Sequence, residues 1–167
     1  CTVTNNRNKA MTSPDGATWT ETDLPSVDKY AVIGSNGSLF VTVVYTKALV
    51  YTSPDGVTWT QYSLPWASNS PSIAYAHGVW VVGDLGYVFY STDAISWQGR
   101  PLPHTSSLYS GWVRWSSSYG KFYLPYYYIG TSYLATSPDG YSWSSSALPW
   151  NSLSWREVCD KGGVLVL

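Results

Sequence analysis

Acidic side chains are the first candidates for chemistry in this chain of 167 residues. Glu21 and Glu157 are the only glutamates, and Asp84 and Asp160 are aspartates outside any repeated motif. Hydrolysis of a glycosidic bond needs two facing carboxyl groups, one acting as an acid and the other as a base or nucleophile. A pair drawn from Glu157, Asp84 and Asp160 leaves a glycoside hydrolase-like enzyme open as an alternative function.

Histidine and cysteine are scarce, with two of each. His77 precedes the glycine of a predicted turn and is interpreted as a turn residue, and His104 follows a Leu-Pro pair. No Ser/His/Asp or Cys/His arrangement can be built from them, and they share no metal-site spacing. We therefore predict no catalytic residues, no metal and no cofactor. Cys1 and Cys159 either form one disulfide between the chain ends or stay two thiols.

Arginine is the remaining candidate for ligand chemistry. Arg114 and Arg156 each lie six residues before a predicted turn glycine, Gly120 and Gly162. The same count in the other repeats gives Ala31 and Ser72. Two arginines at equivalent positions can grip a carboxylate or sulfate bidentately. The alternative is that they pair with acidic neighbours such as Glu157.

A repeated motif must position these side chains. It occurs as SPDGATW (13–19), SPDGVTW (53–59), STDAISW (91–97) and SPDGYSW (137–143), and each copy is followed by a Leu-Pro pair. The segments 39–44 (LFVTVV), 79–82 (VWVV), 121–124 (KFYL) and 164–167 (VLVL) are rich in β-branched and aromatic residues and follow Gly-containing turns. A period of roughly 40–45 residues with several short strands is typical of a propeller blade.

The blade predicted from this pattern has four strands. The first runs near 30–34, 72–76, 113–117 and 155–159, the second follows the Gly turn, the third ends at the motif Ser, and the fourth carries the motif Trp. Residues 1–167 are thus predicted to be a single all-β domain. We expect a β-propeller of about four four-stranded blades, closed by pairing of its N- and C-terminal strands. Thr2–Thr4 is a fifth second-strand segment, so a piece of a longer propeller is the alternative.

The motif residues are predicted to be structural. Pro sets φ in the turn, Asp bonds the backbone beyond it, Gly takes the position with φ > 0, and Trp packs between neighbouring blades. The third copy has Thr92 and Ala94 in place of Pro and Gly, which predicts a looser turn. The structural set is Ser13, Asp15, Gly16, Trp19, Ser53, Asp55, Gly56, Trp59, Asp93, Trp97, Ser137, Asp139, Gly140 and Trp143.

The motif resembles the Asp-box of sialidase-like propellers, Ser-x-Asp-x-Gly-x-Thr-Trp, in a form with one residue fewer between Asp and Gly. It is similar to repeats in phage tail and receptor-binding proteins and in bacterial secreted propeller proteins. The resemblance covers essentially the whole chain and implies blade architecture, with the motif turn remote from any ligand. A sialidase of that family would also need three substrate-binding arginines, a Tyr–Glu nucleophile pair, an Asp acid and more blades than this chain has repeats.

Aromatic residues, 17% of the chain, predict a binding face. The connections that follow the Leu-Pro pairs and the loops between the second and third strands are expected on one face of the propeller. The candidate ligand-binding residues there are Trp66, Asn69, Trp112, Arg114, Tyr126, Tyr127, Trp150, Asn151 and Arg156. Aromatic rings stack on sugar rings or form protein hot spots. The alternative is that these rings fill the propeller channel or stack between blades.

Composition limits the classes of partner that we expect the chain to bind. Net charge is −1 and only 11% of residues are charged, so neither nucleic acid nor an anionic membrane is attracted as a whole. No apolar run is long enough for a membrane span. We predict a non-catalytic recognition module for a glycan or cell-surface receptor, extracellular or on a virion surface, for example in a phage tail or secreted assembly. The alternative is a structural or decoration propeller that contacts neighbouring protein subunits.

Overall fold

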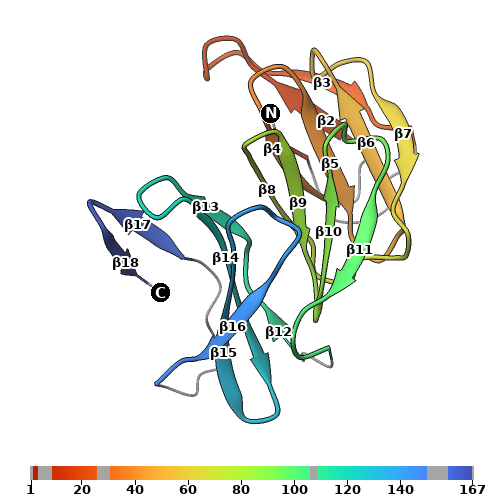
Figure 1. Ribbon diagram of the computed structural model, residues 1–167. Coiled ribbons are helices and arrows are strands. Elements are labelled where there is room, and N and C mark those ends of the chain that lie inside the picture. Colours follow the sequence, from red (N-terminus) through yellow and green to blue (C-terminus); the bar gives the residue numbers. More distant parts are fainter. Residues whose placement is uncertain (1, 4–8, 26–30, 106–108, 150–157, 167) are drawn as a thin grey trace.

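The computed structural model describes residues 2–3, 9–25, 31–105, 109–149 and 158–166. They form antiparallel sheets joined by turns and loops (Figure 1). Blade 1 contains β1 (Thr2–Val3), β2 (Lys9–Thr12) and β3 (Thr20–Asp23). Blade 2 contains β4 (Ala31–Ser35), β5 (Phe40–Val44), β6 (Leu49–Ser53) and β7 (Thr60–Ser63). Blade 3 contains β8 (Ser72–Ala76), β9 (Val79–Gly83), β10 (Tyr87–Ser91) and β11 (Gln98–Pro101).

Blade 4 departs from this simple order. It contains β12 (Tyr109–Ser110), β13 (Arg114–Ser116), β14 (Lys121–Tyr128), β15 (Thr131–Ser137) and β16 (Ser144–Ala147). Both β12 and β13 pair with β14, so the first strand of the blade is interrupted. A terminal hairpin follows, formed by β17 (Cys159–Lys161) and β18 (Val164–Val166). Among the described residues, no helix has the length and apolar character needed to cross a membrane.

The strands form where β-branched and aromatic residues alternate or run together. β5 and β9 are almost wholly buried, as expected for the middle strands of a sheet covered on both faces. The second-strand aromatics Phe40, Trp80 and Phe122 lie opposite the motif serines Ser53, Ser91 and Ser137. Trp80 and Phe122 are fully buried. The apolar core therefore lies between neighbouring blades rather than in a separate layer.

The motif turns share one hydrogen-bond pattern. In blade 2, Ser53 Oγ donates to Asp55 Oδ1 (3.0 Å) and accepts from the Gly56 N–H (2.8 Å). Asp55 Oδ1 accepts from the N–H groups of Val57 (2.8 Å) and Thr58 (2.7 Å). The same bonds recur around Asp15, Asp93 and Asp139. Each of the four motif copies therefore forms a hydrogen-bonded turn.

The sequence predicts a looser third turn, but that turn keeps the same geometry as the others. Ala94 adopts φ 61°, and its N–H donates to Ser91 Oγ (2.9 Å) as a glycine would. The left-handed conformation costs roughly 1–2 kcal/mol for a residue with a Cβ. Burial offsets this cost, because Ala94 is 0% exposed in an apolar cluster with Val41 and Val43 of blade 2.

The predicted closure of the ring is also corrected. In the described part of the chain, β17 and β18 pair only with each other, and blade 1 is a separate sheet. The reason lies in β1, which already pairs with β2 through Thr2↔Met11 and Val3↔Ala10. The edge at which the terminal hairpin was expected to join blade 1 is therefore taken, and the blades form an open arc (Figure 1).

The connections between blades lie beside the loops between second and third strands, as predicted. The connection after blade 2 bridges to the loop of its own blade at Tyr45↔Ser68. It also reaches blade 3, where the Asp84 carboxylate accepts from the N–H groups of Asn69 (3.1 and 3.2 Å) and Ser70 (2.8 Å). Asp84 is 3% exposed, so this buried carboxylate holds two blades in register.

Candidate binding site on the inner strands

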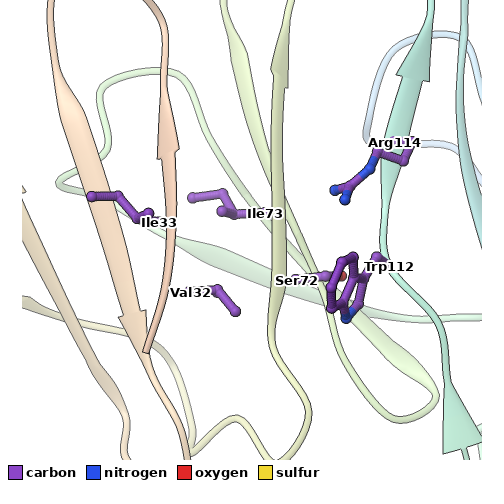
Figure 2. A pocket seen from close by; sticks show the side chains of 6 residues that line it. All are labelled: Val32, Ile33, Ser72, Ile73, Trp112 and Arg114. Atoms are coloured by element: carbon purple, nitrogen blue, oxygen red, sulfur yellow. The ribbon is translucent and has the colours of Figure 1, made fainter. Parts of the chain in front are cut away.

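A cavity of about 190 Å³ opens where the first strands of blades 2, 3 and 4 meet. It is lined by Val32 and Ile33 of β4, Ser72 and Ile73 of β8, Trp112 before β13 and Arg114 of β13. Figure 2 shows Trp112 and Arg114 across the cavity from Val32 and Ile33. Pockets for drug-sized ligands start at about 300 Å³. The cavity therefore suits a single ring or a small charged group.

The strand register explains why these residues converge. Ser35, Tyr75 and Trp115 lie opposite the second-strand aromatics Phe40, Trp80 and Phe122. Counting back three residues from each reaches Val32, Ser72 and Trp112. The same level of three successive blades therefore supplies one residue each to the cavity.

Ser72 holds the blade 4 side of the cavity in place. Its hydroxyl accepts from the Val113 N–H (2.9 Å) and donates to the Gly83 carbonyl (3.4 Å), and the side chain is 3% exposed. Val113 is fully buried. Because side chains alternate along an extended strand, burying Val113 turns its neighbours Trp112 and Arg114 to the opposite side, toward the cavity.

Trp112 and Arg114 form one composite surface. The Cζ atom of Arg114 lies 5.2 Å from the centroid of the Trp112 ring, within the range of a cation–π contact. Nη1 of Arg114 also donates to the Val113 carbonyl (3.2 Å), which orients the guanidinium. Trp112 remains 43% exposed. The exposed ring can stack on a ligand ring, and the guanidinium beside it can donate hydrogen bonds to an acidic substituent.

A second cavity of about 100 Å³ adjoins the first through Val32. It is lined by Ala31, Val32, Tyr45, Ser70 and Pro71. Tyr45 is 37% exposed. The two cavities share Val32 in their linings. Sequence reasoning missed their β4 and β8 lining, because Val32, Ile33 and Ile73 read as ordinary strand residues.

Trp66, predicted to share a binding face with Trp112, does not line the cavity. Its ring packs edge-on to Tyr87 (5.4 Å between centroids) and tilted against Phe89 (5.0 Å). A Cβ on Gly99 would come within 2.0 Å of the ring, so the indole lies directly over that glycine. Trp66 thus packs on β10 and β11, the outer strands of blade 3, while Trp112 lies at the inner strands. The backbone of Asn69 is held by Asp84, as described above, and its side chain is exposed.

Tyr126 is a core residue rather than a surface one. It is 3% exposed, stacks on Tyr133 (5.4 Å, 18°), and its hydroxyl lies 2.6 Å from His104 Nδ1. Burial raises the pKa of the Tyr126 phenol. His104 also stacks on Tyr128 (4.9 Å) and lies against Tyr133 (4.3 Å), so it fills a box of tyrosines. Tyr127 is half-buried and lies opposite Tyr109.

The predicted equivalence of the arginines is corrected by the strand register. Arg114 lies one residue before Trp115, so its equivalents are Gly34 and Ala74, not Ala31 and Ser72. The count from glycine fails because the turn before Phe122 is longer than those before Phe40 and Trp80. In the terminal hairpin, Asp160↔Leu165 places Cys159 at the level of Arg114. The candidates Trp150, Asn151 and Arg156 lie outside the described residues.

The candidate acidic pair is not assembled at the cavity. Asp84 is occupied by backbone N–H groups, and Asp160 accepts from the Ser116 hydroxyl (2.8 Å). Hydrogen bonds from the Ser118 and Ser116 hydroxyls lower the pKa of Asp160. Glu157 and Cys1 lie outside the described residues. Cys159 is a free, exposed thiol, so the option of a disulfide with Cys1 is not realised. His77 is a turn residue as predicted, with φ 48°.

No protein-family model and no curated protein matches the chain significantly. Solved structures do match. The chain is similar to virginiamycin B lyase from Staphylococcus aureus, with a TM-score of 0.71 and 14% identity over 85% of this chain and 49% of that chain. The fold is a β-propeller. A catalytically inactive variant of that lyase with quinupristin gives a TM-score of 0.66 and 14% identity, over 89% of this chain and 59% of the other.

A GH74 enzyme from Niastella koreensis also shares the propeller fold. Its TM-score is 0.58 at 18% identity, over 84% of this chain and 22% of that enzyme. The chain spans about half the length of the lyase chains that it matches. Identities this low establish the fold alone, so the function is argued from the site itself.

Proposed function

We propose that the chain is a non-catalytic recognition module that binds a glycan or a cell-surface receptor. The observation that carries the proposal is the exposed Trp112 ring with the Arg114 guanidinium beside it, at the cavity between the inner strands. Sugar rings present an apolar face that stacks on an indole. A carboxylate or sulfate on the sugar would accept two parallel hydrogen bonds from the arginine.

The surroundings of the site support recognition more than catalysis. Two described groups that could act as acid or base are engaged in structural contacts: Asp84 with backbone N–H groups, and His104 within the tyrosine box. Val32, Ile33 and Ile73 give the cavity apolar walls. A rigid, largely apolar cavity with one oriented cation matches the chemistry of ligand binding sites.

The experiment is a glycan-array screen of the purified chain beside two variants. Trp112→Ala removes the stacking ring, and Tyr109→Ala removes an aromatic side chain that is 56% exposed on β12 but does not line the cavity. We expect the first variant to lose at least about tenfold in affinity, equivalent to about 1.4 kcal/mol, and the second to bind like the unchanged protein.

Arg114→Lys then defines the ligand class. Lysine keeps the charge but not the planar fork, so binding of carboxylated or sulfated glycans should fall while binding of neutral glycans is unchanged. Circular dichroism verifies that each variant is folded. No binding to any glycan, or equal loss in the Trp112 and Tyr109 variants, would reject a glycan site at this cavity and favour a protein receptor or a structural role.

We also propose that the motif turns are short Asp-box turns, and that the protein acts outside the cell or on a virion surface, as in a phage tail or secreted assembly. The turn hydrogen bonds and the low charge content support this reading. The second candidate function is a structural propeller that contacts other subunits. An exposed motif tryptophan, Trp19, favours it.

A further inference from the structure

A groove of about 460 Å³ lies between β11 of blade 3 and the motif turn of blade 4, and we call it the outer groove. Arg100 and Pro101 of β11 line one side together with the Leu-Pro pair that follows, and Tyr141 and Trp143 of the turn line the other. It shares no lining residue with the two cavities at the inner strands. Its volume falls within the range of small-ligand pockets, roughly 300–1,000 Å³.

Three residues at this junction differ in kind from their counterparts in the repeat. Tyr90 directly precedes the motif Ser, Arg100 is the third residue after the motif Trp, and Tyr141 directly follows the motif Gly. The other copies have, at these three positions in turn, Thr12, Thr52 and Thr136; Thr22, Tyr62 and Ser146; and Ala17, Val57 and Ile95. The junctions between blades 1 and 2 and between blades 2 and 3 thus form without the arginine or the pair of tyrosines. The fold therefore does not require these side chains.

Tyr90 fixes the guanidinium of Arg100 at one end of the outer groove. Nε of Arg100 donates to the Tyr90 hydroxyl (3.1 Å), and Cζ lies 5.7 Å from the centroid of the Tyr90 ring. The hydroxyl in turn donates to Gln98 Oε1 (2.7 Å). Because Nε is already used, the two Nη groups are the edge that can donate parallel hydrogen bonds to a carboxylate or sulfate.

The charge of Arg100 is not neutralised by a direct partner. Among the described residues, no carboxylate lies within ion-pair distance of it. The hydrogen bond to Tyr90 is the main cause that raises the pKa of Arg100, and the charge of Asp139 adds to it. Asp139 itself accepts from the N–H groups of Tyr141 and Ser142 (2.8 Å each), which holds the motif turn in place. An oriented cation is therefore available to an acidic ligand.

Aromatic rings form the apolar wall beside this cation. The Tyr141 ring packs edge-on against Tyr90, with 4.8 Å between centroids and 83° between planes. The Trp143 indole is held by a hydrogen bond from its Nε1 to the Gly140 carbonyl (3.0 Å). Tyr141 and Trp143 are both half-buried, so part of each ring remains accessible. Rings fixed in this way can pack on the apolar face of a ligand ring without losing much side-chain freedom.

Pro101 favours a small ring-shaped ligand over an extended peptide. It lies in β11, which is the edge strand of blade 3. A peptide that adds a strand to a sheet edge is held by main-chain hydrogen bonds. Proline has no N–H group to donate, so it interrupts such pairing at the edge.

We propose that the outer groove is a second binding site, specific for an acidic sugar residue. Arg100 binds the carboxylate or sulfate of the sugar, and the sugar ring packs on Tyr141 and Trp143. This site is separate from the inner cavity, so it does not depend on Trp112 or Arg114. Neutral sugars are poor ligands for it, because they leave the guanidinium without an anionic partner.

The test is calorimetric titration of the Trp112→Ala variant, in which the inner cavity has lost its stacking ring, with trigalacturonate and with galactotriose, its neutral counterpart. We expect trigalacturonate to bind at least about tenfold more tightly. In the same background, Arg100→Thr should lose that advantage, and Tyr141→Ile should weaken the binding of both sugars. Both substitutions introduce a residue that another blade has at the same position. Tyr62→Thr, the same change at the equivalent position of blade 2, is the matched control and should leave binding unchanged.

Several outcomes would overturn the proposal. They are no binding of trigalacturonate to the Trp112→Ala variant, equal binding of the two sugars, or binding that the Arg100→Thr substitution leaves unchanged. A triglutamate peptide carries comparable charge without sugar rings. If the peptide binds through Arg100 and trigalacturonate does not, the groove belongs to an acidic protein partner instead. Thermal unfolding of each variant verifies that loss of binding does not reflect loss of the fold.

Discussion

At the scale of single residues, the motif aspartates are anchors rather than reactive groups. Asp55 and Asp93 accept two backbone N–H groups each through one oxygen. These bonds hold the pKa of both carboxyls at about 2, below the ordinary 3.8. The backbone donors lie two and three residues beyond each aspartate, so the spacing of the motif is what lowers the pKa.

The pH dependence of stability follows from these aspartates. A carboxyl whose pKa is lowered by folding stabilises the protein fully above its unfolded value of about 3.8, and this is lost as pH falls toward 2. We expect the melting temperature to fall between pH 4 and about 2. The double variant Asp55→Asn, Asp93→Asn should be less stable at neutral pH and show a shallower fall. An unchanged slope would contradict the assignment.

At the scale of elements, a few buried polar contacts fix one strand against the next. Ser72 of β8 bonds the Val113 N–H of blade 4, and Asp84 bonds the connection from blade 2. Ser68, in that connection, is fully buried but its hydroxyl has no hydrogen-bond partner. Two serines of equal size thus have different roles, which gives a matched pair for substitution.

Ser72→Ala should destabilise the fold by about 1–3 kcal/mol, because it leaves the buried Val113 N–H without an acceptor. The same change should weaken ligand binding at Trp112, whose backbone this bond positions. Ser68→Ala is the control and should cost little or be stabilising, because it removes an unsatisfied hydroxyl. Urea unfolding measures both variants. Equal losses in the two would show that the Ser72 bond is not the source of the effect.

At the scale of the whole molecule, stability depends on contacts between blades. Apolar clusters join blade 1 to blade 2, blade 2 to blade 3, and blade 3 to blade 4. Blades that contact only their neighbours behave as a linear array, in which terminal units are the least stabilised. Trp19 is 45% exposed, so we expect it to contribute less to stability than the buried motif tryptophans Trp59 and Trp97.

Trp59→Ala should cost about 3–5 kcal/mol, the usual range for removing a buried Trp. Trp19→Ala should cost much less, because that indole is 45% exposed. Chemical unfolding measures the free energy of unfolding of both variants. Equal costs for the two would contradict this account of the contacts between blades.

The repeated parts of this protein can be predicted from local sequence. The motif turns, the strands beside them and the buried aromatics opposite the motif serines depend on φ preferences, side-chain alternation and local hydrogen bonds, all within a few residues. That information is local, so it can be recognised in the sequence of a single repeat. The prediction of a looser turn at Ala94 was wrong because it did not take account of the burial of Ala94 against blade 2.

What the repeats enclose depends on how the blades pack against one another. Trp66 and Trp112 both lie in connections that follow a Leu-Pro pair, yet one covers Gly99 and the other lines a cavity. The difference arises because their surroundings come from other blades, distant in sequence. The register of β13, and with it the place of Arg114, depends on a turn length that counting from glycine does not capture. Site and ring closure are therefore properties of packing between blades, which no single repeat encodes.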